Sequence, residues 1–503
     1  MTSAYEKARL ARIEANEAFL AELDVGKERR NAEAPLVKAK QSKARAREVN
    51  RKRRAREAEQ NPVPRRKSSR LAGNPAEGMY VDSVSRGKVT IAGLPSSMTK
   101  EVRDLVSTTP AANSRRERFN EEILNLEIEG DDEAHGKAFF ESLKKTSSDS
   151  DDKNGNAEDS EEGLRESEMD YAAKLSALEC QGSEKVVQSR GYAVAFHPKL
   201  PILCAGDRDG QLGLLKIHED AAIELQEEDI VQFKPHVSTI NVVEYADTSL
   251  FTASYDGTAR KMDLGAPGRF ELLYKSDEEH GWLQHAEITH QGNNLVIGFS
   301  DGYVMSIDAR APTESKPAWS FQAHDKKTQT VSLDHTGNFL CTSSLDRSIR
   351  LWDVRKASSS RKPPSPICTF EDRYSINSCK FNATGDRLIA VGQSNKLHLF
   401  MNPQKSTDGE LKPSHSLAHD NQTGRYLAVF HANWDPKNPS AFICGSMSKP
   451  RRVEVFSTDG GKIKRIMNLA GDAIGSVQSR NAFHPNQNMI ACLNASGRVS
   501  IFR

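Results

Sequence analysis

The stretch Ser344-Leu345-Asp346-Arg347-Ser348-Ile349-Arg350-Leu351-Trp352-Asp353-Val354-Arg355 contains a tight turn and a short apolar strand that ends in Trp-Asp. Six other segments of the 503-residue chain end in a similar way. The equivalents of Trp352 are Leu215, Met262, Ile307, Phe400, Phe456 and Phe502. In chain order, the seven positions are 47, 45, 45, 48, 56 and 46 residues apart. The C-terminal two thirds of the chain therefore consist of one repeated unit.

A period near 45 residues with a Trp-Asp ending is typical of one blade of a WD40 β-propeller. We therefore predict an all-β fold, a seven-bladed WD40 β-propeller with a largely disordered, partly helical N-terminal extension. Each repeat has a first strand, an apolar second strand, a turn such as Asp256-Gly257 and a third strand. The last repeat ends beside Arg503, so we expect its fourth strand to come from residues 184–188 and to close the ring.

Charge and composition divide the rest of the chain. We expect an N-terminal helix in residues 1–26, a basic disordered segment in 27–75, a mixed and acidic linker in 76–183 and the propeller in 184–503. Residues 38–70 hold fourteen Lys or Arg against three Glu, whereas residues 147–170 hold ten acidic against two basic residues. The basic segment predicts nuclear localisation and contact with DNA phosphates, and the alternative is a solvated linker.

Two smaller expectations concern the linker. A helix is expected near residues 115–126, within an otherwise mixed segment. Residues 144–170 are rich in Ser, Asp and Glu, which predicts disorder.

No catalytic motif is found in the sequence, neither a phosphate-binding Gly-rich loop, nor His-Glu-x-x-His, nor Gly-x-Ser-x-Gly. We therefore predict a protein that is not an enzyme and needs no cofactor or metal. His324 is expected to be structural, and His197 and His484 are expected to be turn residues. The seven cysteines form no Cys-x-x-Cys pair, which favours reduced thiols in an intracellular protein. No apolar run approaches 18 residues, so no membrane association is expected.

Basic residues precede the innermost strand of several blades, on what should be one face of the ring. These residues, with one neighbouring aromatic, are Arg190, Lys326, Lys327, Arg373, Arg425, Tyr426 and Arg480. Taken together they predict a rim that binds phosphates. The alternative for any single one is ordinary solvated surface charge.

Several stretches resemble the family of WD repeat proteins related to the UV-damaged-DNA-binding protein. They are Tyr192–Pro198, Ala205–Gly210, Trp282-Leu283, Asp346–Arg355 and the quite specific His419–Trp434. Tyr5–Leu10 and Arg66–Leu71 resemble the fungal "changed mutation rate" branch of DNA damage-binding proteins.

The resemblance implies a nuclear protein that binds single- and double-stranded DNA, prefers UV-damaged DNA and acts in DNA metabolism or the damage response. It also implies that Arg190, Lys326 and Lys327 contact phosphates. In the UV-damage relative a hairpin before blade six wedges into the duplex, and Arg425 and Tyr426 match it. Gly424 replaces an aromatic residue there, which argues against a deep wedge.

Trp352–Arg355 also fits a pattern found in substrate receptors of cullin-4 ubiquitin ligases, although it is equally the ordinary strand ending of blade four. The alternative function is therefore a protein-interaction scaffold, a chromatin or cullin-4 ubiquitin-ligase adaptor with incidental DNA affinity. Expected partners are DNA, chromatin or repair proteins and, under this alternative, a cullin-4 ligase adaptor.

Overall fold

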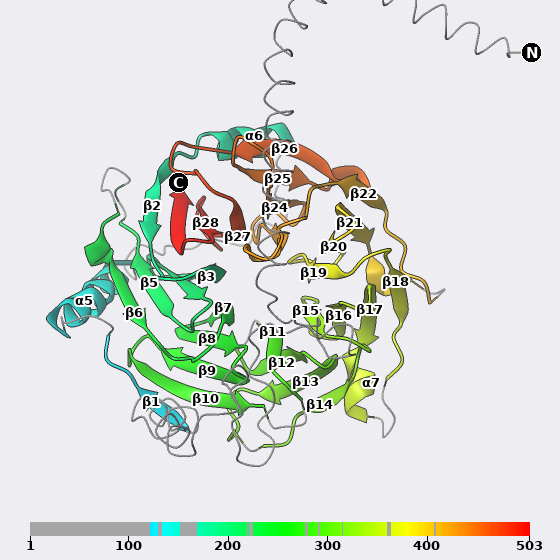
Figure 1. The fold of residues 1–503 in the computed structure, drawn as a ribbon, viewed down its shortest axis with the longest axis horizontal. Helices are drawn as coiled ribbons and strands as arrows, with labels where there is room; N and C mark the ends of the chain where they lie inside the picture. Colours follow the sequence, from blue (N-terminus) through cyan, green and yellow to red (C-terminus); the bar gives the residue numbers. More distant parts are fainter. Residues whose placement is uncertain are drawn as a thin grey trace, which may run out of the picture. The chain divides into compact units, whose positions relative to one another are not determined.

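The computed structural model describes residues 121–128, 133–150, 168–218, 220, 225–276, 280–289, 292–313, 315–359, 364–406 and 409–503. The expected N-terminal helix and basic segment lie outside these residues. Seven antiparallel sheets surround a central axis, each with its first strand innermost (Figure 1). The predicted seven-bladed propeller is confirmed.

Each blade has four strands in the same order from the axis outward, and one blade carries a fifth strand at its outer edge. The first strands are β3 (Gly191–Phe196), β7 (Ile240–Ala246), β11 (Leu283–Ile288), β15 (Thr328–Leu333), β19 (Ile376–Phe381), β23 (Asn433–Trp434) and β27 (Gln478–Phe483). The second strands are β4 (Ile202–Asp207), β8 (Ser249–Ser254), β12 (Asn294–Phe299), β16 (Phe339–Ser344), β20 (Arg387–Gly392), β24 (Ala441–Gly445) and β28 (Ile490–Asn494). The third strands are β5 (Leu212–Lys216), β9 (Thr258–Asp263), β13 (Tyr303–Asp308), β17 (Ser348–Asp353), β21 (Lys396–Met401), β25 (Val453–Ser457) and β29 (Arg498–Phe502). The fourth strands are β6 (Ile230–Phe233), β10 (Arg269–Lys275), β14 (Trp319–Gln322), β18 (Cys368–Glu371), β22 (His415–Ala418), β26 (Lys464–Leu469) and β2 (Cys180–Lys185).

The second strands form the packed interior of the blades. All residues of β4, β20, β24 and β28 are buried, as their nearly continuous apolar sequences predict. Adjacent blades share hydrophobic clusters, for example Val296 with Val331 and Trp352. The ring is therefore stabilised by contacts between blades as well as within them.

Blade four is braced by a buried polar network around His324. The Nδ1 atom of His324 lies 2.9 Å from a carboxylate oxygen of Asp346, and its Nε2 lies 2.7 Å from Oγ1 of Thr342. Trp352 donates its indole N–H to the same Thr342 oxygen at 2.9 Å. Burial lowers the pKa of His324. His324 is thus structural, as expected, and Trp352 is fixed by a hydrogen bond as well as by packing.

The turns between second and third strands explain the Asp-Gly pairs. Asp256 accepts the backbone N–H of Thr258 at 2.9 Å, and Gly257 has φ of 86°. In blade four the same left-handed position is occupied by Arg347, with φ of 80°. A residue with a Cβ is strained in this region of φ, so Arg347 is retained at a cost in stability.

The ring is closed by strands from both ends of the propeller sequence. Strand β2 pairs with β29, which places Glu184 opposite Val499 and Lys185 opposite Arg498. The expected closure is confirmed, but the strand lies earlier than residues 184–188. Val186 and Val187 leave the strand and are fully buried, and both donate their backbone N–H to Gly497.

Two expectations for the linker need correction. A helix was expected over residues 115–126, of which the structure describes 121–126. Strand β1 (Ile123–Asn125) lies there instead; it pairs with β10, and of its three residues only Leu124 is buried. Helix α5 (Glu133–Ser150) enters the segment expected to be disordered, and α6 (Glu168–Ser176) begins at its other end, while residues 151–167 lie outside the described residues. Both linker helices bury apolar side chains on the blades, Phe139 and Phe140 from α5 and Tyr171 from α6. Burial of these faces favours order over disorder.

The remaining helix, α7 (Val354–Ser359), follows β17. Of the helices that the structure describes, none has the length and apolarity needed to cross a membrane. The seven cysteines are free thiols, and all except Cys180 are buried.

Candidate nucleic-acid interface

One rim of the propeller gathers two kinds of segment from every blade. Since the strands of a blade alternate in direction, the segments entering the first strands and the turns between second and third strands lie on the same rim, here named the entry rim. Backbone hydrogen bonds tie the two kinds together: Arg208 donates to Arg190 at 2.9 Å, and Leu345 donates to Lys327 at 3.1 Å. The entry rim is thus a fixed surface.

The basic residues predicted from the sequence, apart from Arg480, lie in these segments. Lys326, Arg373 and Arg425 are exposed, whereas Arg190 and Lys327 are half-buried. Burial lowers the pKa of Lys327, which makes an anionic ligand favourable beside it. The prediction placed these cations on one rim, and the topology of the blades agrees.

Large exposed apolar side chains collect on the same rim. Among described residues there are six, and four of them precede first strands: Val237 (45% exposed), Trp282 (40%), Tyr374 (49%) and Tyr426 (72%). A soluble surface seldom gathers aromatic rings at one edge without a ligand.

Two of these rings are paired with cations. The guanidinium carbon of Arg373 lies 5.4 Å from the ring centre of Tyr374, and that of Arg425 lies 5.6 Å from the ring centre of Tyr426. Flat rings next to guanidinium groups are suited to stacking on bases while the charge meets the backbone.

The segment before blade six is irregular but anchored. Asn421 is fully buried and donates from its side chain to the carbonyls of Gly392 and Lys396 at 2.9 and 3.1 Å. Gly424 has φ of 67°, and a Cβ built there would touch nothing within 4 Å. Arg425 and Tyr426, here named the tip, therefore project from a segment that is anchored at Asn421.

Arg480 does not lie on the surface of the rim as expected. It is the third residue of β27, not part of the segment that precedes this strand, and it is only 8% exposed. Its Nε donates to the carbonyl of Tyr192 at 2.6 Å and its Nη1 to that of Val429 at 2.5 Å.

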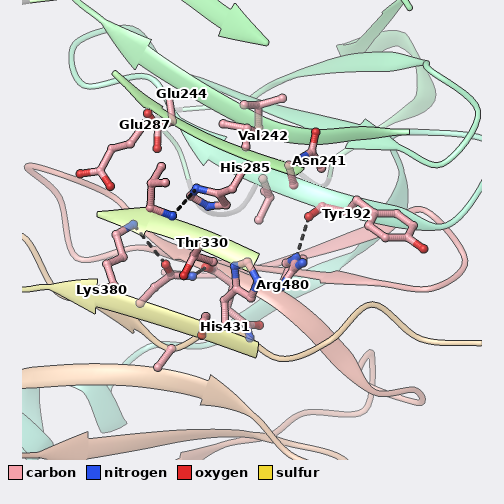
Figure 2. A pocket seen from close by; sticks show the side chains of 18 of the residues that line it. Tyr192, Asn241, Val242, Glu244, His285, Glu287, Thr330, Lys380, His431 and Arg480 are labelled. Carbon is pink, nitrogen blue, oxygen red and sulfur yellow. Dashed lines mark hydrogen bonds between the residues drawn. The ribbon is translucent and has the colours of Figure 1, made fainter. Parts of the chain in front are cut away.

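The central channel holds a cavity of about 100 Å³ lined by first strands. Figure 2 shows Glu244, Glu287 and Lys380 toward one end and Arg480 with Tyr192 toward the other. Burial and the neighbouring Glu244 carboxylate raise the pKa of Glu287 to about 8, and burial lowers the pKa of His285 to about 3. The channel thus has carboxylates toward one end and a guanidinium toward the other.

On the opposite rim, Asp353 and Arg355 form a two-point ion pair at 2.8 and 2.9 Å, and Asp308 and Arg310 repeat it in blade three. The two hydrogen bonds from the Arg355 guanidinium lower the pKa of Asp353. This arginine is therefore already engaged within the chain.

Other histidines of the repeat serve turns. The Nδ1 of His197 accepts the backbone N–H of Leu200 at 2.8 Å, and His484 does the same for Gln487 at 3.0 Å. Within the described ranges, no group of three or more His, Cys, Asp or Glu side chains is placed to bind a metal.

The sequence reasoning missed four rim residues. It passed over Arg208, Arg347 and Tyr374, and it used Trp282 only as part of a resemblance. Arg208 and Arg347 lie in turns after second strands, and the search had covered only segments before first strands. A search of both kinds of segment could have found them.

Comparison with known proteins agrees with this architecture. The family "WD domain, G-beta repeat" matches residues 315–353. The chain is 30% identical to DNA damage-binding protein CMR1 of Phaeosphaeria nodorum over 63% of its length and 66% of the relative. It is 28% identical to DNA damage-binding protein cmr1 of Aspergillus oryzae over 99% of both chains. It is 30% identical to WD repeat-containing protein 76 of Xenopus laevis over 63% of its length and 54% of the relative.

The seven blades and the repeat match define a WD40-repeat β-propeller protein. Within that class, the chain belongs to the WD repeat family that includes these fungal DNA damage-binding proteins.

Proposed function

We propose that this protein binds DNA, single- and double-stranded, through the entry rim, prefers UV-damaged DNA, and acts in the nucleus in DNA metabolism or the damage response. The observation that carries the proposal is the coincidence of cations and exposed aromatic rings on one rim, with Arg373 on Tyr374 and Arg425 on Tyr426. The names of the relatives support the connection with damaged DNA.

The cations supply affinity for DNA that does not depend on the DNA sequence. Lys326, Lys327, Arg373, Arg190 and Arg425 lie in segments that enter four different blades. Each phosphate that they neutralise releases counterions, so affinity falls steeply with salt.

The projecting tip supplies the preference for damage. Tyr426 is the most exposed aromatic ring of the rim, and its base is fixed by Asn421. Inserting a ring beside a base requires unstacking, which costs a few kcal/mol and less at a damaged step. Gly424 offers no side chain for a deep wedge, so a modest preference is expected.

The test compares three forms of the protein on intact and UV-irradiated duplexes by fluorescence anisotropy at several salt concentrations. They are the full chain, residues 1–120 and residues 121–503. The cut is placed before Glu121 because β1, α5, α6 and β2 all pack on the blades. We expect residues 121–503 to retain DNA binding and the damage preference. If residues 121–503 bind no DNA at low salt, the rim proposal is wrong.

A second candidate is a protein-interaction scaffold, such as a chromatin or cullin-4 ligase adaptor. The Trp352–Arg355 ending on the opposite rim, which fits the pattern of cullin-4 substrate receptors, supports it, although the Arg355 side chain is held by Asp353. Affinity for DNA that barely changes with salt or irradiation would favour this function over the first.

A further inference from the structure

Arg480 carries a charge with no carboxylate partner in the part of the chain that the structure describes. Its two hydrogen bonds go to the neutral carbonyls of Tyr192 and Val429. Burial lowers the pKa of this guanidinium to about 10, a value at which it stays charged at neutral pH. A buried, uncompensated cation is costly unless an anion reaches it.

The surroundings of Arg480 leave the charge open toward the channel. Arg480 lines the cavity (Figure 2), and among the described residues its Nη2 has no hydrogen-bond partner. The neighbouring rings of His285 and His431 are neutral, because burial lowers the pKa of both. The carboxylates of Glu244 and Glu287 lie toward the far end of the channel, near Lys380.

A second cation and a hydroxyl stand above this position. Arg190 donates from Nη1 to the hydroxyl of Tyr192 at 3.3 Å, so the Tyr192 proton is free to be donated elsewhere. Tyr192 and Arg480 both line the channel near the rim ends of β3 and β27. The channel mouth thus combines two guanidinium groups and one hydroxyl donor.

We propose that the channel mouth, formed by Arg480, Tyr192 and Arg190, is a binding site for a terminal phosphate of a DNA strand. Backbone phosphates of a duplex are flanked by sugars on both sides and cannot descend to a recessed guanidinium. A terminal phosphate projects from the strand and carries about −1.5 to −2 charges, which suits a buried cation. The proposal rests on DNA binding by the entry rim, and it adds recognition of strand ends.

The experiment uses the full chain and two versions of one single-stranded oligonucleotide, with either a 5′-phosphate or a 5′-hydroxyl. We expect the phosphorylated version to bind about tenfold to hundredfold more tightly, the fold-change of a hydrogen bond to a charged group. Arg480→Gln, which removes the charge, should abolish this ratio. Tyr192→Phe, which removes only the hydroxyl, should reduce it. Lys412→Gln on the opposite rim is the matched control and should leave it unchanged.

Thermal unfolding of each variant checks the fold, and Tyr192→Phe carries the test if Arg480→Gln does not fold. Equal affinity for both oligonucleotides overturns the end-recognition proposal while DNA binding by the rim stands. If neither oligonucleotide binds, the proposed function fails, and titration with inorganic phosphate followed by ³¹P NMR decides the site. If inorganic phosphate binds and Tyr192→Phe weakens that binding, the phosphate site stands. If inorganic phosphate does not bind, the phosphate site is overturned.

Discussion

The Nη1 atom of Arg190 lies 3.2 Å from the carbonyl oxygen of Arg425, a residue 235 positions away in sequence. A cation of blade one therefore supports the tip that precedes blade six. Arg480 of blade seven supports the same segment through the carbonyl of Val429. The tip is thus fixed by contacts from two other blades, which favours a preformed projection over a mobile loop.

Removing the tip side chains should affect damage recognition more than affinity. In Arg425→Ala with Tyr426→Ala, we expect the ratio of affinities for UV-irradiated and intact duplex to approach one, because the stacking ring and its cation are lost. Competition binding at fixed salt measures the ratio. The control Lys405→Ala with Lys412→Ala changes exposed cations between β21 and β22 on the opposite rim. A ratio unchanged by the tip substitution would show that damage is recognised elsewhere.

Reversing charge on the rim should weaken binding to all DNA. For Lys326→Glu with Lys327→Glu, we expect about a tenfold or greater loss and a salt dependence shallower by about one phosphate contact per lysine. Plots of log affinity against log salt give the slope. Lys405→Glu with Lys412→Glu is the matched control. An equal loss in the control would mean that only net charge matters.

The strained turn in blade four should show a conflict between stability and binding. Arg347→Gly relieves the positive φ of 80° and should stabilise the fold by about 1 kcal/mol. The same change removes a rim cation and should weaken DNA binding. Arg347→Ala removes the cation but keeps the strain, so its melting temperature should not rise. If the Arg347→Gly and Arg347→Ala variants have the same melting temperature, the turn carries no strain.

Stability should depend on the protonation of Glu287. Its pKa is raised to about 8 by burial and by Glu244, against 4.5 for an ordinary glutamate. The folded state therefore holds a proton that the unfolded state releases between these values, and stability falls as pH rises through this window. Glu287→Gln should be neutral below pH 4.5 and stabilising above pH 8, by on the order of 1–3 kcal/mol. Denaturant unfolding across pH measures this, with Glu271→Gln, a half-buried glutamate of β10, as control. A gain that does not change with pH would contradict it.

Removal of the closing strand should abolish cooperative unfolding. A chain ending at residue 495 lacks β29, whose Val499, Ile501 and Phe502 are buried, and leaves β2 unpaired. Calorimetry should show a broad transition at lower temperature. A chain ending at Phe502 loses only Arg503 and is the control. If the chain ending at residue 495 melts as sharply and as high as the parent, the ring does not depend on this closure.

The sequence allowed the ring to be predicted because its signal is repeated. Trp352 and its equivalents all fall at or next to the end of third strands, so one strong repeat set the register for weaker ones such as Leu215. The ring closure was also predictable, since a blade with three strands needs a fourth. Its position was wrong by about four residues because Val186 and Val187 look like strand residues but are buried beyond it.

The features that could not be predicted from the sequence are those that depend on tertiary contacts. Ile123–Asn125 is a strand only because β10 offers a free edge, and no local pattern reveals that edge. Arg480 resembles its exposed counterparts in residue type, but it is the third residue of β27 instead of preceding the strand, and it lines the channel. Which segments lie on the entry rim follows from the topology and was predictable, whereas the burial of a single side chain depends on the residue at which each strand begins.

The pairing of β2 with β29 also bears on how the propeller is made in the cell. Synthesis proceeds from β2 through six complete blades before β29 exists. During that time β2 presents an open strand edge, and the neighbouring blades have no closed ring to hold them. A newly made chain therefore needs either rapid completion or a chaperone that covers this edge, and nascent chains stalled before residue 498 should be the form most prone to aggregate.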